Sequence, residues 1–277
     1  MGRRTATTLT GLALTLSIAF SGCGVKGLAP PTPACAPCVQ TEETVCDFME
    51  LEEGTKVLYE TTPGDVDKKP IAYTHGLSQD YRCVYDVIRK GGHPILTWSV
   101  PGHYGSDSLH GGKEHTIERA AEIFEKLIRH NQDFLGDDYI RMGASMGGMI
   151  VAEHACRYPD DRTGVVMLVS QDFAPDNLAL DLIDFYVTSL GIKPLQEYVC
   201  SIRNLYLCED IQATRNNWVI VSGQLDRLTP DGKQTADRLG ERAHYYEIKG
   251  AGHSLPSTHK REVDRILEYE SPFLMQR

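Results

Sequence analysis

Basic residues are too few in this chain to balance its acidic ones. The 277 residues include 28 lysines and arginines against 38 aspartates and glutamates, which gives a formal net charge of -10. No run of basic side chains interrupts this pattern. Because a nucleic-acid-binding surface needs concentrated positive charge to neutralise phosphates, the composition argues against nucleic acid as a partner.

The chain also lacks an apolar segment at its N-terminus that is long enough to cross a membrane. Leu9 to Phe20 has 12 residues, whereas a membrane-spanning helix needs about 20. Arg3 and Arg4 precede this segment, and a short charged stretch followed by a short apolar one is typical of a signal peptide. We therefore expect residues 1–22 to be a signal peptide.

A cysteine follows the apolar segment directly. Phe20-Ser21-Gly22-Cys23 resembles a bacterial lipobox, although Leu is usual where Phe20 stands. The alternative is an ordinary secretory signal followed by an incidental cysteine. The position of Cys23 favours lipidation, which predicts an exported protein tethered to a membrane surface and facing the periplasm or the cell surface.

Residues 23–46 have the composition of a linker. Four prolines lie among small and polar residues, which favours extended backbone outside any core. Cys35 and Cys38 form a C-x-x-C pair without the strand and helix of a redox motif. Disulfide bonding fits an exported chain better, and the pattern leaves its connectivity open.

From Lys56 onward, expected strands and helices alternate, so residues 47–277 are predicted to form one domain. Regular alternation predicts an α/β fold with a mainly parallel sheet and helices on both faces. Expected strands cover 56–60, 70–74, 94–100, 138–142, 164–170, 218–222 and 245–248; expected helices cover 79–90, 117–128, 146–158, a segment ending at 238, and 260–270.

The most informative motif is Gly143-Ala144-Ser145-Met146-Gly147. It fits G-x-S-x-G, in which a serine occupies a sharp turn between a strand and a helix. The glycines leave room where side chains would collide with neighbouring elements. Both the expected strand before the motif and the expected helix after it are in place, so Ser145 is the candidate nucleophile.

Three further segments supply what a serine nucleophile needs. Leu77 follows a His-Gly pair at the end of a strand, where its N–H and that of Met146 can stabilise an oxyanion. Asp226 follows a strand and can orient an imidazole. His253 lies on a glycine-flanked loop after the last strand and can act as general base and then general acid. His75 is interpreted as structural.

The order Ser145, Asp226, His253 is that of α/β-hydrolases. The chain resembles the esterase and lipase-like branch of the α/β-hydrolase superfamily from its first expected strand to its C-terminus. Residues 101–107 are similar to the P-G-H-G-x-S-D turn of that superfamily, whereas Ser99 stands where many relatives carry Asp. The resemblance implies an α/β-hydrolase fold and a serine hydrolase that cleaves carboxylic esters through an acyl-enzyme, without cofactor or metal.

Several alternatives stay open. Asp172 could replace Asp226 as the acid, since some lipases of this fold place it there. His103, His110 and His115 could suggest a metal cluster, but their loop lacks ligand spacing, and a solvated loop fits better.

The stretch at about 172–215 is long enough for a small cap. Its apolar part, Asn177 to Leu190, is either a lid or a core helix. The same triad could also serve an acyltransferase, an aminopeptidase or a carbon–carbon bond hydrolase. A non-catalytic surface binding protein is the alternative outside enzymes. Substrate chain length and oligomeric state are not predicted.

Overall fold

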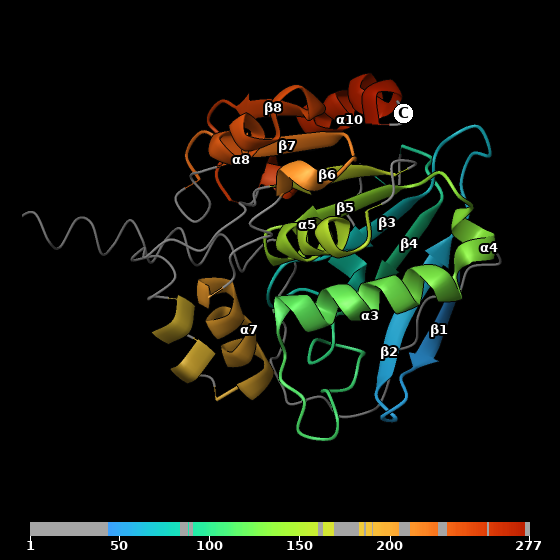
Figure 1. The fold of residues 1–277 in the computed structure, drawn as a ribbon, viewed down its shortest axis with the longest axis vertical. Coiled ribbons are helices and arrows are strands. Elements are labelled where there is room, and N and C mark those ends of the chain that lie inside the picture. The colour runs from blue at the N-terminus through green and yellow to red at the C-terminus, as the bar shows by residue number, and fades with distance from the viewer. Residues whose placement is uncertain are drawn as a thin grey trace, which may run out of the picture.

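The described residues form an eight-stranded sheet with helices on both faces (Figure 1). The strand order is β1-β2-β4-β3-β5-β6-β7-β8. Strands β1 and β2 are antiparallel to their neighbours, and β4 to β8 pair in parallel with β3 among them. The computed structural model describes residues 44–83, 88, 91–159, 163–168, 183–185, 187–189, 191–204, 211–226, 232–253 and 255–274.

The element bounds follow the expected alternation closely. The strands are β1 (Val45–Glu50), β2 (Lys56–Thr62), β3 (Ile71–Thr74), β4 (Ile95–Trp98), β5 (Ile140–Ala144), β6 (Gly164–Leu168), β7 (Trp218–Gly223) and β8 (Ala243–Ile248). The helices are α3 (Ile117–His130), α4 (Gln132–Leu135), α5 (Met146–Arg157), α7 (Lys193–Asn204), α8 (Gly232–Leu239), α9 (Leu255–Thr258) and α10 (Lys260–Leu274), with short 3₁₀ turns at Tyr81–Cys83, Ile211–Ala213 and Gly240–Arg242.

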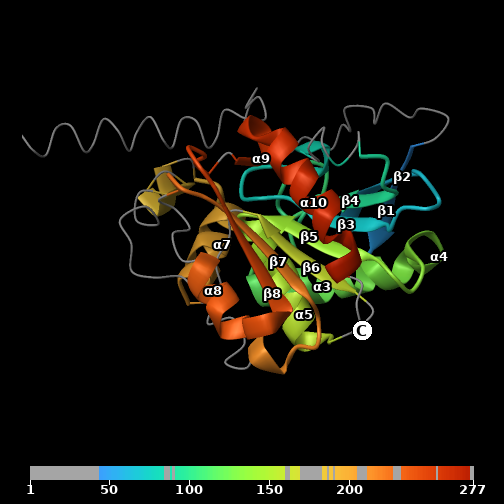
Figure 2. The ribbon, with the colours of Figure 1, turned by 90° about the horizontal axis from the view of Figure 1, so that it is seen from above.

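Two apolar cores lie on the two faces of the sheet. Successive side chains of a strand point to opposite faces, so Ala72 of β3 packs with α3 and α5, whereas Ile71 and Tyr73 pack with α10. Figure 2 shows α9 and α10 on one side of the sheet and α3, α5 and α8 on the other. The central strands are buried on both faces and anchor the loops at their ends.

Helix α3 begins where the sequence predicts. The Thr116 hydroxyl accepts a hydrogen bond from the Arg119 N–H at 3.1 Å, which satisfies one of the free donors of the first turn. The inner face of the helix is fully buried, and Phe124 stacks on Trp98 with ring centroids 5.7 Å apart. The helix is therefore fixed to the sheet by its apolar face.

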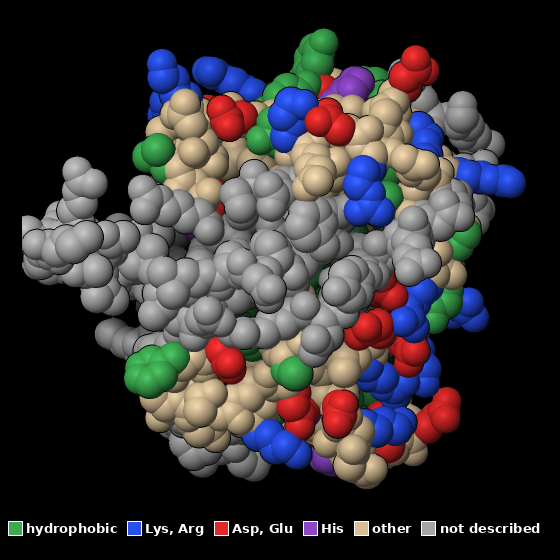
Figure 3. Space-filling model, turned by 60° about the vertical axis from the view of Figure 1, so that its left-hand side comes forward, with side chains coloured by type: hydrophobic (Ala, Val, Ile, Leu, Met, Phe, Trp, Pro, Cys, Tyr) green, Lys and Arg blue, Asp and Glu red, His purple; other side chains and the backbone are tan. Residues whose placement is uncertain are grey.

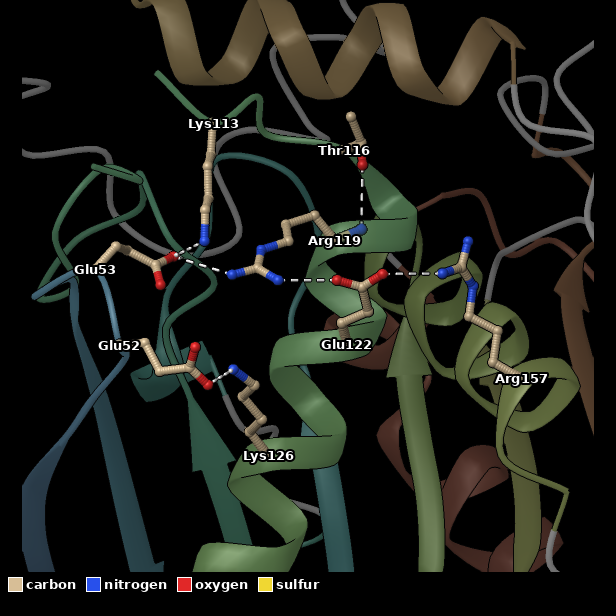
Figure 4. A network of polar contacts seen from close by, with 8 residues as sticks. All are labelled: Glu52, Glu53, Lys113, Thr116, Arg119, Glu122, Lys126 and Arg157. Atoms are coloured by element: carbon tan, nitrogen blue, oxygen red, sulfur yellow. Dashed lines mark hydrogen bonds and ion pairs between the residues drawn. The ribbon is translucent and has the colours of Figure 1, made fainter. Parts of the chain in front are cut away.

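The outer face of α3 carries a network of ion pairs (Figure 4). Arg119 contacts Glu53 at 3.0 Å and Glu122 at 2.9 Å, and Glu122 in turn contacts Arg157 of α5 at 3.1 Å. Lys113 also contacts Glu53, at 3.2 Å. Figure 3 shows the same mixture more widely, with Lys and Arg side chains interspersed among Asp and Glu on the described part of one face.

Helices α4, α7 and α9 were not among the expected helices. Two further elements differ from the expectation. Strand β1 was not predicted, and it begins inside the stretch assigned to the linker. The helix expected at 79–90 opens instead as a 3₁₀ turn at Tyr81–Cys83. There the Asp80 carboxylate accepts the Arg82 N–H at 2.9 Å, so a side chain takes a backbone donor at the start of the turn. Residue 88 is helical, and its neighbours at 84–87 and 89–90 lie outside the described residues.

The N-terminal expectations concern residues that the structure does not describe. The signal peptide, Cys23, and the linker up to residue 43 all lie outside the described residues, as does Asp172. Cys46 of β1 takes part in a disulfide bond. Within the described part of the chain, no helix combines the length and apolar character that a membrane crossing requires.

Candidate active site

Ser145 occupies the turn between β5 and α5, as the sequence predicts. Its φ of 53° and ψ of -122° place a non-glycine residue in a sparsely populated backbone region. The turn is tight against β3, because a Cβ atom on Gly147 would lie 2.1 Å from the Thr74 carbonyl oxygen. Only glycine fits there. The close approach of the turn to β3 therefore explains why the motif has a glycine at this position.

Ser145, His253 and Asp226 form one chain of hydrogen bonds. His253 Nε2 lies 2.9 Å from Ser145 Oγ, and His253 Nδ1 lies 3.0 Å from Asp226 Oδ2. The Asp226 side chain is fully buried, and the His253 side chain is 13% exposed. An ionised carboxylate only accepts hydrogen bonds, so Nδ1 carries the proton and Nε2 is free to accept from the serine hydroxyl.

The loops that carry Asp226 and His253 are joined through their backbones. The Leu225 N–H donates to the Ala251 carbonyl at 2.7 Å, and the Gln224 N–H donates to the Ile248 carbonyl at 3.0 Å. The Gln224 side chain also accepts the Gly250 N–H at 3.1 Å. Asp226 and His253 are therefore held at a fixed separation by the ends of β7 and β8.

The two expected oxyanion donors are the N–H groups of Met146, which follows Ser145 in the chain, and of Leu77, which follows Gly76. Met146 is the first residue of α5, where a helix N-terminus presents unpaired N–H groups and a favourable field for an anion. Leu77 follows the end of β3, the strand that pairs with β5. The preceding Gly76 is so close that a Cβ atom on it would lie 3.3 Å from the Ser145 Cβ.

A small apolar cluster from the expected cap region lies beside Leu77. Val187, Leu195 and Val199 form its buried part, and Leu77 packs against it. Ile183 and Ile192 complete it. Most of the segment 177–190, the lid or core helix of the sequence interpretation, lies outside the described residues.

Helix α7 is fixed to the core by polar contacts that the sequence did not reveal. Glu197 Oε2 lies 2.6 Å from His115 Nδ1 and also accepts the His115 backbone N–H at 3.0 Å. The Ser201 hydroxyl accepts the Ile117 N–H at 2.9 Å. The side chain of Tyr198 is fully buried beneath the helix. Each contact joins residues more than 80 positions apart, and no local sequence signal predicts such pairs.

The histidines that could have suggested a metal cluster have other surroundings. His103 is buried, with its ring 4.9 Å from the His75 ring and 5.5 Å from that of Tyr198. Burial, with His75 nearby, keeps the pKa of His103 well below its usual value. His110 is exposed. Among the described residues, no group of three or more His, Cys, Asp and Glu side chains is placed to hold a metal ion.

The fold and the candidate site together define the structural class of the protein. The sheet order, the crossover helices and the serine at the strand–helix turn are those of the α/β-hydrolase fold. Ser145, Asp226, His253 and Leu77 all lie at the carboxyl ends of parallel strands, the edge at which open α/β sheets bind ligands.

Comparison with known proteins supports the fold and no closer relationship. No protein-family model matches the chain, and no curated protein matches it. Among solved structures, a thermophilic esterase from Thermogutta terrifontis superposes with a TM-score of 0.68 at 15% identity, covering 84% of this chain and 100% of the esterase. An esterase from Exiguobacterium antarcticum has a TM-score of 0.69 at 12% identity, covering 81% and 98%. A bromoperoxidase from Bacillus anthracis has a TM-score of 0.63 at 18% identity, covering 84% and 100%.

Proposed function

We propose that this protein is a serine hydrolase that cleaves carboxylic esters. The observation that carries the proposal is the hydrogen-bonded chain from Ser145 through His253 to the buried Asp226. The esterases among the similar folds are consistent with it, although at their identities they speak for the fold alone. No cofactor or metal is required for this chemistry.

The geometry supports an acyl-enzyme mechanism. Ser145 Oγ attacks the ester carbonyl carbon while His253 Nε2 takes its proton. The N–H groups of Leu77 and Met146 stabilise the oxyanion, and Asp226 stabilises the imidazolium that forms. His253 then gives the proton to the leaving alcohol, and a water that it deprotonates releases the acid.

We further propose that the protein is exported and held at a membrane surface by lipidated Cys23. The charged and apolar segments of residues 1–22 and the position of Cys23 support this. The disulfide at Cys46 fits an oxidising compartment. Small-molecule esters are the proposed substrates, and nucleic acid is not a proposed partner of so acidic a chain.

Ester turnover by the full chain tests the enzymatic proposal. p-Nitrophenyl esters from acetate to palmitate would be assayed beside a Ser145→Ala variant, with fluorophosphonate labelling of both proteins. We expect turnover and labelling that vanish in the variant, and the preferred chain length then separates an esterase from a lipase. Turnover that survives in Ser145→Ala would overturn the serine mechanism, and labelling without ester turnover would point to another acyl substrate.

A further inference from the structure

The peptide between Gly76 and Leu77 is held in one orientation by groups that take no part in the triad. Its carbonyl accepts a hydrogen bond at 2.7 Å from His75 Nδ1 and a second at 3.2 Å from the Gln79 N–H. The Gln79 side chain also accepts the Gly76 N–H at 2.9 Å. Two residues therefore fix both peptide planes on either side of Gly76.

The His75 ring can make its contacts in only one form. A carbonyl oxygen accepts, so Nδ1 carries the proton that bonds Gly76; the Val100 N–H donates to Nε2 at 3.0 Å, so Nε2 is bare. The side chain is fully buried. That burial, ahead of the opposing effects of the Gly76 carbonyl and of Asp80, lowers the pKa of His75 to about 4, and the ring is neutral at neutral pH.

The geometry of a peptide bond carries this constraint to the oxyanion site. The described peptide bonds are all trans, and a trans peptide is planar with its C=O and N–H pointing in opposite directions. A Gly76 carbonyl directed at His75 and Gln79 therefore turns the Leu77 N–H the other way. Gly76 itself lies against Ser145, so a rotated peptide would present a carbonyl oxygen near an oxyanion in place of a donor.

We propose that His75 and Gln79 are positioning residues that aim the Leu77 N–H at the oxyanion. The inference rests on the proposed hydrolase function, and it gives a role to a histidine that the sequence indicates only as structural. Neither side chain contacts the reacting atoms in this proposal; both act through the Gly76–Leu77 peptide. Their loss should lower kcat and leave KM little changed, because an oxyanion forms only in the transition state.

The first test compares His75→Asn with His75→Gln in the full chain. Asn places an amide N–H near the position of Nδ1 and can still bond the Gly76 carbonyl, whereas Gln places its amide near Nε2. We expect His75→Gln to lower kcat roughly 10- to 100-fold, somewhat less than the ~10²–10³-fold cost of deleting an oxyanion donor, and His75→Asn to recover most of it. Affinity for a boronic acid inhibitor, which mimics the tetrahedral state, should fall in parallel with kcat.

Gln79 provides an independent pair, because its side chain is partly exposed and its substitution need not disturb the core. Gln79→Glu keeps an oxygen that can accept the Gly76 N–H, and Gln79→Met is of similar size without one. We expect a lower kcat in Gln79→Met and a smaller change in Gln79→Glu. If the His75 variants fail to fold, the two Gln79 variants still test the positioning role.

His154→Gln is the matched control. His154 is as completely buried as His75 and is hydrogen bonded at both ring nitrogens, but it lies near the far end of α5. We expect it to lose stability and to keep kcat within about twofold. Unchanged kcat and boronate affinity in both His75→Gln and Gln79→Met would overturn the positioning role. A wild-type protein that neither cleaves esters nor reacts with a fluorophosphonate would instead overturn the proposed function.

Discussion

Asp226 determines which ring nitrogen of His253 carries the proton. The imidazole bonds Asp226 through Nδ1 and Ser145 through Nε2. A carboxylate at Asp226 enforces the tautomer that leaves Nε2 able to accept a proton, and an amide there could donate to Nδ1 instead.

We therefore expect Asp226→Asn to lower kcat by roughly 10⁴-fold, the loss found for the same change in a Ser–His–Asp triad. Ester turnover at a saturating substrate concentration would measure it. Asp237→Asn is the matched control, because Asp237 lies on α8 with its side chain 65% exposed, and its activity should equal that of the wild type. Full activity in Asp226→Asn would show that another residue is the acid of the triad, with Asp172 the first alternative.

At the scale of single residues, the sequence predicts the candidate triad but not the residues that support it. A glycine lies within three positions of each of Ser145, Asp226 and His253, close to the end of a strand, and that pattern is visible in a single chain. The bonds from His75 to Gly76 and Val100 depend on how a ring is rotated within a packed core. No spacing rule encodes such an orientation.

Helix α7 is held to the core at more than one point. Its Glu197 accepts two hydrogen bonds from His115, and its Ser201 accepts one from Ile117 at the start of α3. Leu195 and Val199 of the same helix pack in the cluster that contacts Leu77. The helix thus forms a fixed wall beside the candidate site.

Glu197→Ala should weaken the attachment of α7 to the core. The His115 N–H would lose its acceptor, and leaving a buried donor unsatisfied costs about 1–3 kcal/mol. Chemical denaturation would measure the lower free energy of unfolding, and hydrogen exchange should become faster in α7. Lys193→Ala is the control, because its ion pair with Glu197 involves a lysine side chain that is 83% exposed, and exposed pairs contribute at most about 1 kcal/mol. Equal stability of both variants would contradict the anchoring role.

Helices and strands are predicted from the periodicity of apolar residues where one face of the element, or all of it, is buried. Helix α3 and strands β3 to β8 were predicted because their apolar residues repeat regularly or run continuously. Strand β1 is not predicted from the sequence, because Met49 is the only one of its residues that is buried. Its identity as a strand comes from pairing with β2, which is not a local property of the sequence.

Buried histidines make the stability of the whole molecule depend on pH. Burial lowers the pKa of His154, which lies between Arg141 and Glu125, to about 4, as it does for His75. In the unfolded chain both have an ordinary pKa near 6.5. Between those values the unfolded state binds protons that the folded state does not, so stability falls as the pH drops from about 6.5 toward 4.

We expect the free energy of unfolding to decrease by up to roughly 3 kcal/mol for each of the two histidines over this range. Urea denaturation at pH values from 7.5 to 4.5 would measure it, and His154→Gln should remove about half of the pH dependence. Stability that stays level between pH 6.5 and 4.5 in the wild type would show that these rings are protonated in the folded protein.

The proposed lipidation of Cys23 predicts where the whole protein is found. Cys23→Ser, expressed in a Gram-negative host, should move the protein from the membrane fraction to the soluble exported fraction, because the acyl chains provide the anchor. Immunoblots of separated fractions would measure the change, and Cys35→Ser should stay with the membrane. A Cys23→Ser protein that remains in the membrane fraction would contradict a lipid anchor at this residue.

The direction of β1 determines the end of the sheet at which the chain enters the domain. Because β1 is antiparallel to β2 and β2 is antiparallel to β4, β1 runs in the same sense as the parallel strands. The chain therefore enters the domain at Val45 from the end of the sheet opposite to the end that carries Ser145 and His253. If Cys23 carries the proposed lipid, the tether therefore joins the described domain at the end of the sheet that lies away from the candidate triad, and the point of attachment does not compete with an ester for the same end of the sheet.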